Sequence, residues 1–511
     1  MRLRSCRTLI VALAVVAASH AGPSAAQTFN SVPVGRPAGG GGGSGGSGGL
    51  ATGVLIGAGI VAGGLLIGAA TRPPPQTIDA PPPGEPEGPI RPVRRRFVPP
   101  NPGAEQVRSV RRTLPPRPGF TIPAADERRY VAGEILVSIK GQVTPARLRR
   151  LETRYGLAPL ASAHIALLDL DVRRYRIGRG QNVPGAIGAM RGAPQFVAAI
   201  EPNFVYELQE DKQPQPAGDS IPAPAGGTIQ APAGGLPPDK PPQYAITALK
   251  LDAAHKISAG ANVLVAVIDT GLDETNPEIE GTVADRFDAV GGEFVPLSHG
   301  TAMGGVIVAH KTLTGVAPQA RLLAIRAFTN QNSGPNGTGF DILRGLDFAA
   351  SHGARIVNMS FAGPEDALLR DALDAARKQG IIEIAAAGNA GPNSKPLYPA
   401  AQSGVIAVTA TDASDKIFAK ANRGAYVSVA APGANVIAPG LGGAVQFTSG
   451  TSVAAAEVSG VAALLLQADG KASPDEIRKI LSETAHRLAA DQAGAGAGLV
   501  DAAAAVGATP H

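Results

Sequence analysis

Hydrophobic positions in the second half of the chain form short continuous runs, separated by stretches with helical spacing. The apolar runs are VLVAVID (263–269), RLLAIRA (321–327), RIVNMS (355–360), IIEIAAAGN (381–389) and GVIAVTAT (404–411). Helical patterns cover about 341–352, 365–379, 452–468 and 473–487. Uninterrupted apolar strands that alternate with helices are typical of a parallel sheet covered on both faces. Residues 241–511 are therefore predicted to form a doubly wound, mainly parallel α/β domain, with its active groups at the carboxyl ends of strands.

A different pattern precedes this domain, over residues 130–208. Strand-like alternation at 131–139 is followed by an amphipathic helix at 144–156, strand-like runs at 164–172 and 174–180, a short helix near 184–191 and a strand at 196–208. The order β-α-β-β-α-β predicts a small α+β module of ferredoxin-like topology. A linker rich in Pro, Ala and Gly, residues 209–240, connects the module to the α/β domain.

The N-terminal region has the composition of targeting and linker segments. Residues 1–26 combine a basic start, an apolar run and small residues, which predicts a signal peptide and export to the periplasm, the cell envelope or the medium. Residues 27–49 read as a Gly-rich linker, and the Pro- and Arg-rich residues 71–129 are predicted to be disordered. Between them, residues 50–70 are uncharged and carry a glycine-zipper-like pattern. Their length suffices for a bilayer but their glycines weaken helicity, so membrane association through this segment stays open.

The net charge of +5 is unevenly distributed along the 511 residues. Residues 241–511 hold 19 Lys and Arg against 25 Asp and Glu, whereas residues 1–240 hold 27 against 16. These opposite signs favour docking of the basic module on the acidic domain. The arginine-rich segment lacks interleaved aromatics and any recognisable nucleic-acid-binding module, so no nucleic acid is predicted as a partner. The single cysteine, Cys6, lies in the predicted signal peptide, which argues against a disulfide, a cysteine-ligated metal and a thiol nucleophile.

The stretch GTSVAAAEVSG places a hydroxyl, Ser452, at the start of an alanine-rich helix. One interpretation is that Ser452 or Thr451 caps this helix by accepting a hydrogen bond from a first-turn N–H. The other interpretation is a nucleophile held on a tight turn at a helix N-terminus. This stretch alone favours the cap.

Three further polar residues lie on Gly-flanked turns at predicted strand or helix ends: Asp269, His299 and Asn389. Singly, each has an ordinary explanation as a turn-capping Asp, a structural His or an Asn in a left-handed turn. In the order Asp269, His299, Asn389, Ser452, the sequence closely resembles the subtilisin-like serine proteases (subtilases, peptidase S8). The matching stretches are VAVIDTGLD, HGTAMGGVI, NMSFAGP, AAAGN, GTSVAAAEVSG and GAGLVDAAAAV, within about residues 241–507.

The resemblance implies a serine endopeptidase with Asp269, His299 and Ser452 as its catalytic triad and Asn389 as an oxyanion-hole donor. The module at 130–208 resembles the family's inhibitory propeptide (inhibitor I9), particularly in EILVSIK and IEPNFVYEL. This implies a proenzyme whose own propeptide occupies the cleft until it is cut away within the 209–240 linker. The alternative is a catalytically idle envelope interaction protein that uses the protease fold as a scaffold.

The resemblance also implies that an extended polypeptide substrate lies between two edges of the chain. The edges are Gly337, Thr338 and Gly339 on one side and Ser360, Phe361 and Ala362 on the other, and the pocket for the side chain before the cut is lined by Ala386, Ala387 and Gly388. The chain departs from the family at Ala302, Met303, Ala456 and Ala362, and the last of these would narrow that pocket. No cofactor or metal is predicted. The short segment 306–318 lacks the loop that carries calcium in many relatives, and calcium elsewhere is left open.

Overall fold

The computed structural model describes residues 119–209, 243–331, 334–489 and 493–509. The chain divides into two units, residues 1–105 and 106–511, and the first lies outside the described residues. The predicted signal peptide, the Gly-rich linker, the segment 50–70, and most of the Pro/Arg-rich and 209–240 segments also lie outside them.

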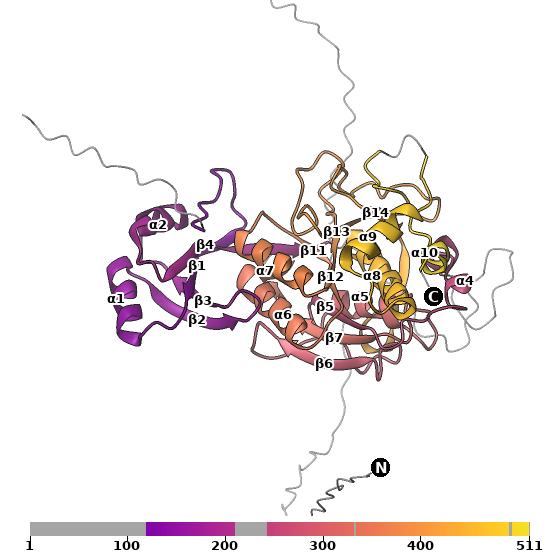
Figure 1. Ribbon diagram of the computed structural model, residues 1–511, viewed down its shortest axis with the longest axis horizontal. Coiled ribbons are helices and arrows are strands. Elements are labelled where there is room, and N and C mark those ends of the chain that lie inside the picture. Colours follow the sequence, from indigo (N-terminus) through magenta and orange to yellow (C-terminus); the bar gives the residue numbers. More distant parts are fainter. Residues whose placement is uncertain (1–118, 210–242, 332–333, 490–492, 510–511) are drawn as a thin grey trace, which may run out of the picture. The chain divides into compact units, whose positions relative to one another are not determined.

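The domain that follows residue 243 is built on a sheet of seven strands, all of them parallel (Figure 1). In spatial order the strands are β14 (Val429–Pro432), β13 (Ile406–Thr411), β12 (Ile382–Ala386), β10 (Ile356–Met359), β5 (Leu264–Asp269), β7 (Arg321–Arg326) and β6 (Val283–Asp288). The order reverses beside β5, which confirms the predicted doubly wound sheet. The polar strand β6 was not predicted, because it lies at the sheet edge and needs no continuous apolar run.

Helices cover both faces of this sheet (Figure 1). Helices α5 (Ser298–Val308) and α8 (Thr451–Ala468) pack on one face, and α6 (Gly339–Ser351) and α7 (Ala367–Lys378) pack on the other. Along β5, Val265 and Val267 join the core of α5 and α8, whereas Ala266 and Ile268 join that of α6 and α7. A strand buried on both faces must be apolar throughout, which explains the run VLVAVID.

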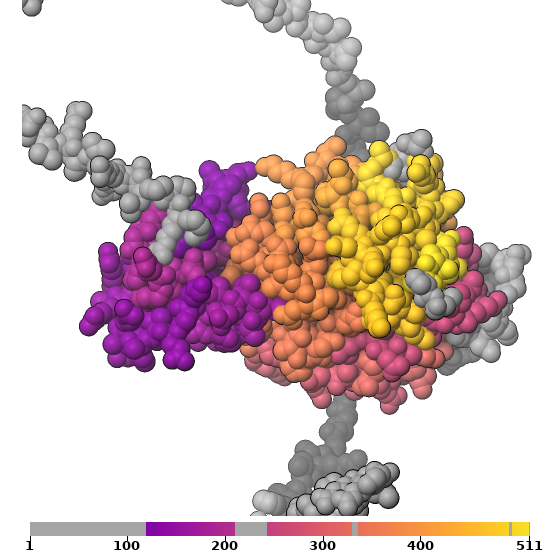
Figure 2. Space-filling view, in the orientation of Figure 1, coloured from indigo at the N-terminus to yellow at the C-terminus, as the bar shows by residue number. Residues whose placement is uncertain are grey.

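Shorter elements complete the domain. They are helices α3 (Tyr244–Ala248), α4 (Leu251–Ala254), α9 (Pro474–Glu483) and α10 (Ala502–Gly507), and the antiparallel pair β15 (Val436–Pro439) and β16 (Val445–Thr448). Much of the yellow C-terminal segment, which includes α9 and α10, lies at the surface in Figure 2. Helix α9 ends at Glu483, four residues before the predicted end of its pattern.

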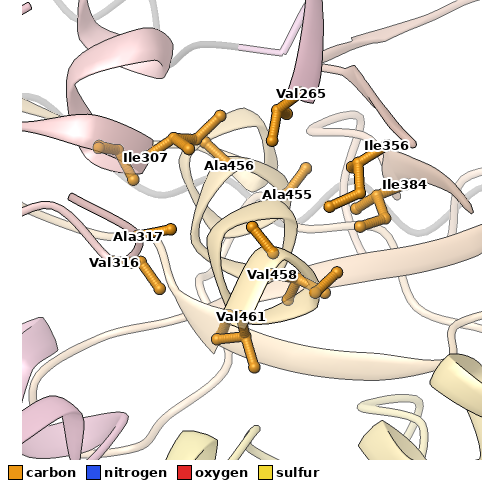
Figure 3. Close-up of a cluster of buried hydrophobic side chains, with 14 of the residues drawn as sticks. Val265, Ile307, Val316, Ala317, Ile356, Ile384, Ala455, Ala456, Val458 and Val461 are labelled. Carbon is orange, nitrogen blue, oxygen red and sulfur yellow. The ribbon is translucent and has the colours of Figure 1, made fainter. Parts of the chain in front are cut away.

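Helix α8 runs through the interior and is buried from Thr451 to Leu466. Figure 3 shows its Ala455, Ala456 and Val458 surrounded by side chains from β5, β10, β12 and α5. Gly460 leaves no room for a side chain, since a Cβ there would lie 2.4 Å from Val316. Among the described residues α8 is the one helix whose length and mean hydropathy, 1.4, would suit a membrane span, but 89% of it is buried, as in a core helix of a soluble protein.

The module before the domain has the predicted order β-α-β-β-α-β. Its elements are β1 (Tyr130–Lys140), α1 (Pro145–Tyr155), β2 (Ala158–Ile165), β3 (Leu170–Arg176), α2 (Val183–Ala189) with a 3₁₀ turn at Met190–Gly192, and β4 (Val197–Leu208). They form the antiparallel sheet β2-β3-β1-β4.

Two boundaries of this module differ from the prediction. The run 164–172 is not one strand, because a turn closed by the Leu168 N–H to the Ile165 carbonyl separates β2 from β3. The run 174–180 is accordingly the end of β3 rather than a strand of its own. Residues 119–129, expected in the disordered segment, are ordered, and Phe120 is buried in the module's core.

The close packing of α8 predicts opposite outcomes for two helical glycines. Gly460→Ala should lower the free energy of unfolding by about 1–3 kcal/mol, because the added methyl group overlaps Val316. Gly507→Ala in α10 is the control, since a Cβ there meets nothing within 4 Å, and it should be neutral or stabilising by up to about 1 kcal/mol. Denaturant unfolding of both variants measures the difference, and equal effects would contradict the packing described for α8.

Candidate active site

Asp269 and His299 meet at the carboxyl end of the parallel sheet. Asp269 ends β5, and His299 lies in the first turn of α5. The His299 Nδ1 atom lies 2.8 Å from Oδ1 and 2.9 Å from Oδ2 of Asp269, and both residues are at most 2% exposed. Because an ionised carboxylate only accepts hydrogen bonds, we assign the Nδ1 proton to His299. This tautomer makes Nε2 the basic nitrogen of the ring.

The turn after β5 holds α5 in place through hydrogen bonds to its first turn. The Gly300 N–H donates to Thr270 Oγ1 at 3.0 Å, and the Asp273 N–H donates to Thr301 Oγ1 at 2.9 Å. A Cβ at Gly300 would lie 2.1 Å from the carbonyl oxygen of Gly271. The motif SHGT therefore needs glycine after His299 so that the two elements can approach closely.

The structure gives the hydroxyls of Thr451 and Ser452 roles other than capping α8. The N-cap is Gly450, which makes no side-chain cap hydrogen bond, so the interpretation that Ser452 or Thr451 caps the helix is wrong. Thr451 Oγ1 donates to Asn389 Oδ1 at 2.9 Å and accepts from the Gly388 N–H at 3.1 Å. The Thr451 N–H also donates to Asn389 Oδ1, at 3.1 Å. These contacts fix the Asn389 amide with its Nδ2 donor turned away from Thr451.

One peptide carbonyl, that of Gln209, receives the remaining donors. Asn389 Nδ2 lies 2.6 Å from the Gln209 oxygen, Ser452 Oγ 2.8 Å, and the Ser452 N–H nitrogen 3.4 Å. The approach is so close that a Cβ at Gly450 would lie 2.1 Å from the same oxygen. The structure thus brings Asn389 and Ser452 together around a carbonyl at the N-terminus of α8, where first-turn N–H groups lack partners within the helix.

The segment that ends at Gln209 is an extended strand between the two predicted edges. Strand β4 pairs antiparallel with β9 (Gly334–Thr338), which continues to β8 (Phe328–Gln331), and with β11 (Phe361–Ala362). The Gln209 N–H donates to the Ser360 carbonyl at 3.1 Å. Gly337, Thr338, Ser360, Phe361 and Ala362 therefore flank a peptide backbone, and Gly339 follows as the first residue of α6.

The side chain of Gln209 contacts the backbone of Asn389 and the backbone of its own segment. Its Oε1 accepts from the Asn389 N–H at 2.7 Å, and its Nε2 donates to the Glu207 carbonyl at 2.9 Å. Ala386 ends β12, and it is buried together with Ala387 and Gly388, immediately before Asn389. Their role as a side-chain pocket remains a prediction.

Side chains of β4 also bind the N-termini of two domain helices. Glu201 Oε2 accepts from the Leu368 N–H of α7 at 3.2 Å, and Asn203 Oδ1 accepts from the Phe340 N–H of α6 at 3.3 Å. Asp366, the N-cap of α7, accepts from the Leu369 N–H at 2.8 Å. Burial, and next the charge of Asp366, raise the pKa of Glu201 well above its ordinary value.

Metal ligands do not cluster in the part of the chain that the structure describes, where no group of three or more His, Cys, Asp or Glu could hold an ion. Within the segment 306–318, the N–H groups of Lys311, Thr312 and Leu313 donate to the carboxylate of Glu278. The backbone of residues 311–313 is thus held by hydrogen bonds to the Glu278 carboxylate.

Comparisons with known proteins point to one family. The model of the "Subtilase family" matches residues 260–501. The thermophilic serine proteinase of Bacillus sp. (strain AK1) is 30% identical over 371 residues, 70% of this chain and 83% of that protein. Thermitase of Thermoactinomyces vulgaris is 34% identical over 254 residues, 48% of this chain and 89% of thermitase. The first of these similarities is longer than residues 260–511, so it extends into the chain before residue 260.

A solved structure has the same fold. The crystal structure of fervidolysin from Fervidobacterium pennivorans, a keratinolytic enzyme related to subtilisin, matches with a TM-score of 0.59 and 25% sequence identity. The match covers 74% of this chain and 61% of that one. It confirms the predicted subtilisin-like fold class.

The buried Glu201 predicts a pH-dependent stability. An acid whose folded-state pKa is raised keeps a proton that the unfolded chain has released, so Glu201 lowers stability as pH rises above its ordinary pKa of 4.5. Glu201→Gln keeps an acceptor for the Leu368 N–H but does not titrate. Its melting temperature should therefore exceed that of the parent by a margin that grows between about pH 5 and pH 8.

This comparison is best made in a Ser452→Ala background, which removes the hydroxyl that faces the Gln209 carbonyl. Glu207→Gln, an exposed position on the same strand, is the matched control and should show no growing margin. A margin for Glu201→Gln that is constant with pH would contradict the raised pKa.

Proposed function

Because the chain belongs to the subtilase family of serine proteases, we propose that it is a serine endopeptidase made as a proenzyme. In this proposal Asp269, His299 and Ser452 form the catalytic triad, and Asn389 is an oxyanion-hole donor. The observation that carries it is the Gln209 carbonyl, which lies against Asn389 Nδ2, Ser452 Oγ and the Ser452 N–H.

In the proposed reaction each of these residues has a defined role. Ser452 Oγ attacks the scissile carbonyl carbon, while His299 Nε2 takes the hydroxyl proton and later gives it to the leaving amine. Asp269 accepts from His299 Nδ1, holds the ring in the required tautomer and stabilises the imidazolium. Negative charge that develops on the carbonyl oxygen is stabilised by Asn389 Nδ2 and the Ser452 N–H, which are already in place.

Polypeptide substrates bind as an extended strand between β9 and β11. Strand β4 supports this mode, because its backbone already pairs with both edges. The module that contains β4 is the propeptide of the proposal, and the Gln209 carbonyl that follows β4 lies against Ser452 Oγ and Asn389 Nδ2, the groups that would act on the bond to be cut. The bond between Gln209 and Glu210 is therefore the proposed maturation site, and the N-terminal signal directs the proenzyme to export.

Processing of the chain itself tests this proposal. Residues 27–511 should release a fragment whose C-terminus is Gln209 and should react with a fluorophosphonate probe. Ser452→Ala should do neither, whereas Ser449→Ala, just before the helix, should behave as wild type. Intact-mass spectrometry and probe labelling measure both outcomes. A wild-type chain that neither processes nor labels would support the idle-scaffold alternative instead.

The oxyanion donor makes a separate kinetic prediction. Asn389→Ala should lower kcat by about 100- to 1,000-fold, the range known for loss of one such donor in subtilisin, with little change in KM. Thr451→Val should give a smaller loss of kcat, because Thr451 only orients the Asn389 amide. Steady-state kinetics on one peptide substrate separate the two parameters. An increase in KM at constant kcat would show that Asn389 serves binding rather than the transition state.

A further inference from the structure

The fourth residue before the proposed cut, Tyr206, fills an enclosed pocket of the domain. Counting back from Gln209, Tyr206 is wholly buried, and its ring contacts Phe361 edge-on with 5.7 Å between centroids. A second wall is backbone, since a Cβ at Gly363 would lie 2.4 Å from the Tyr206 ring. This pocket is therefore shaped for a flat ring.

The far end of the pocket carries a buried acceptor. The Tyr206 hydroxyl donates to Asp366 Oδ2 at 3.2 Å, and Asp366 is only 3% exposed. The other carboxylate oxygen, Oδ1, accepts from the Leu369 N–H as the N-cap of α7. Asp366 is thus fixed by the helix through Oδ1, while Oδ2 accepts from the Tyr206 hydroxyl and Glu201 of β4 also hydrogen-bonds to the Asp366 carboxyl.

We propose that Asp366 makes tyrosine the preferred fourth residue before the cut in substrates of this enzyme, an inference that rests on the proposed endopeptidase function. A phenylalanine in the pocket would fill the same apolar walls but would leave Asp366 Oδ2 without its donor. Leaving a buried charged acceptor unpaired is costly, so a site built around a hydroxyl discriminates against the analogue that lacks it.

A basic side chain is the main competitor for a pocket that ends in a carboxylate. Lysine would have to lose its hydration among Phe361 and the backbone of Gly363, and it presents a flexible stem where the walls fit a ring. Tyrosine brings a neutral donor on a rigid ring of the required length, as Tyr206 does.

Peptides that differ only at the fourth residue test this inference on the enzyme processed from the full chain. The tyrosine peptide should have a kcat/KM at least about tenfold above the phenylalanine peptide. O-methyltyrosine, which keeps the ring and the oxygen but cannot donate, should lose the advantage. Asp366→Ser keeps a good N-cap for α7 and should bring the tyrosine-to-phenylalanine ratio close to one. Asp371→Ser, exposed on the same helix, should keep the wild-type ratio.

The outcomes separate this inference from the function it rests on. Equal rates for tyrosine and phenylalanine, a preference for lysine, or an unchanged ratio in Asp366→Ser would overturn the role of Asp366 while leaving the endopeptidase intact. The O-methyltyrosine comparison needs only wild-type enzyme and decides the question even if Asp366→Ser fails to fold. A chain that cleaves no peptide and binds no fluorophosphonate would overturn both proposals.

Discussion

The geometry of the site depends on the burial of helix α8. Its first turn supplies Ser452 and Thr451, and its body is enclosed by the sheet and α5, so the N-terminus cannot shift independently of the core. A buried polar chain extends this control. Ser459 of α8 contacts Asn358 of β10 at 3.0 Å, Asn358 donates to Ser360 at 2.9 Å, and the Ser360 hydroxyl donates to the Ser452 carbonyl at 3.0 Å. Ser452 and the edge beside the backbone of β4 are therefore positioned by the same helix.

The contacts between module and domain differ from the charge argument made from the sequence. A basic module facing an acidic domain predicts module cations on domain anions, and Arg174 of the module does lie near Asp341 and over the Phe340 ring. Among the described residues, however, the ion pair between the two parts has the reverse polarity: it joins Asp126, just before β1, to Lys395 of the domain, and both side chains are largely exposed. Such a pair contributes little to stability. The buried contacts are instead strand pairing and the binding of Glu201 and Asn203 to helix N-termini, where unpaired N–H groups favour acceptors whatever the net charge.

Sequence reasoning succeeded where burial imposes a pattern and failed where a feature depends on a distant partner. Continuous apolar runs located β5, β7, β10, β12 and β13, because both faces of each are covered. The short strand β11 pairs with β4, and β9 pairs with β4 and β8, and no local pattern encodes these pairings. The four site residues were recognisable from their turns, and Asp269 and His299 do meet. The sequence pattern predicts Thr451 only as a helix cap, whereas in the structure it orients the Asn389 amide. Its position next to Ser452 is the sequence feature that could have indicated this role.

The uncapped start of α8 resolves the ambiguity of GTSVAAAEVSG. Had Thr451 or Ser452 capped the helix, a hydroxyl would have been bound to a first-turn N–H, and both groups would have been lost to an incoming carbonyl. The Thr451 N–H is bound instead by Asn389 Oδ1, so the side chain of a residue distant in the sequence replaces a local cap. Glycine at the N-cap leaves room for the Gln209 oxygen, which would lie 2.1 Å from a Cβ at Gly450. The same first turn thus orients the Asn389 amide and leaves the Ser452 hydroxyl and N–H to the Gln209 carbonyl, where the proposed chemistry takes place.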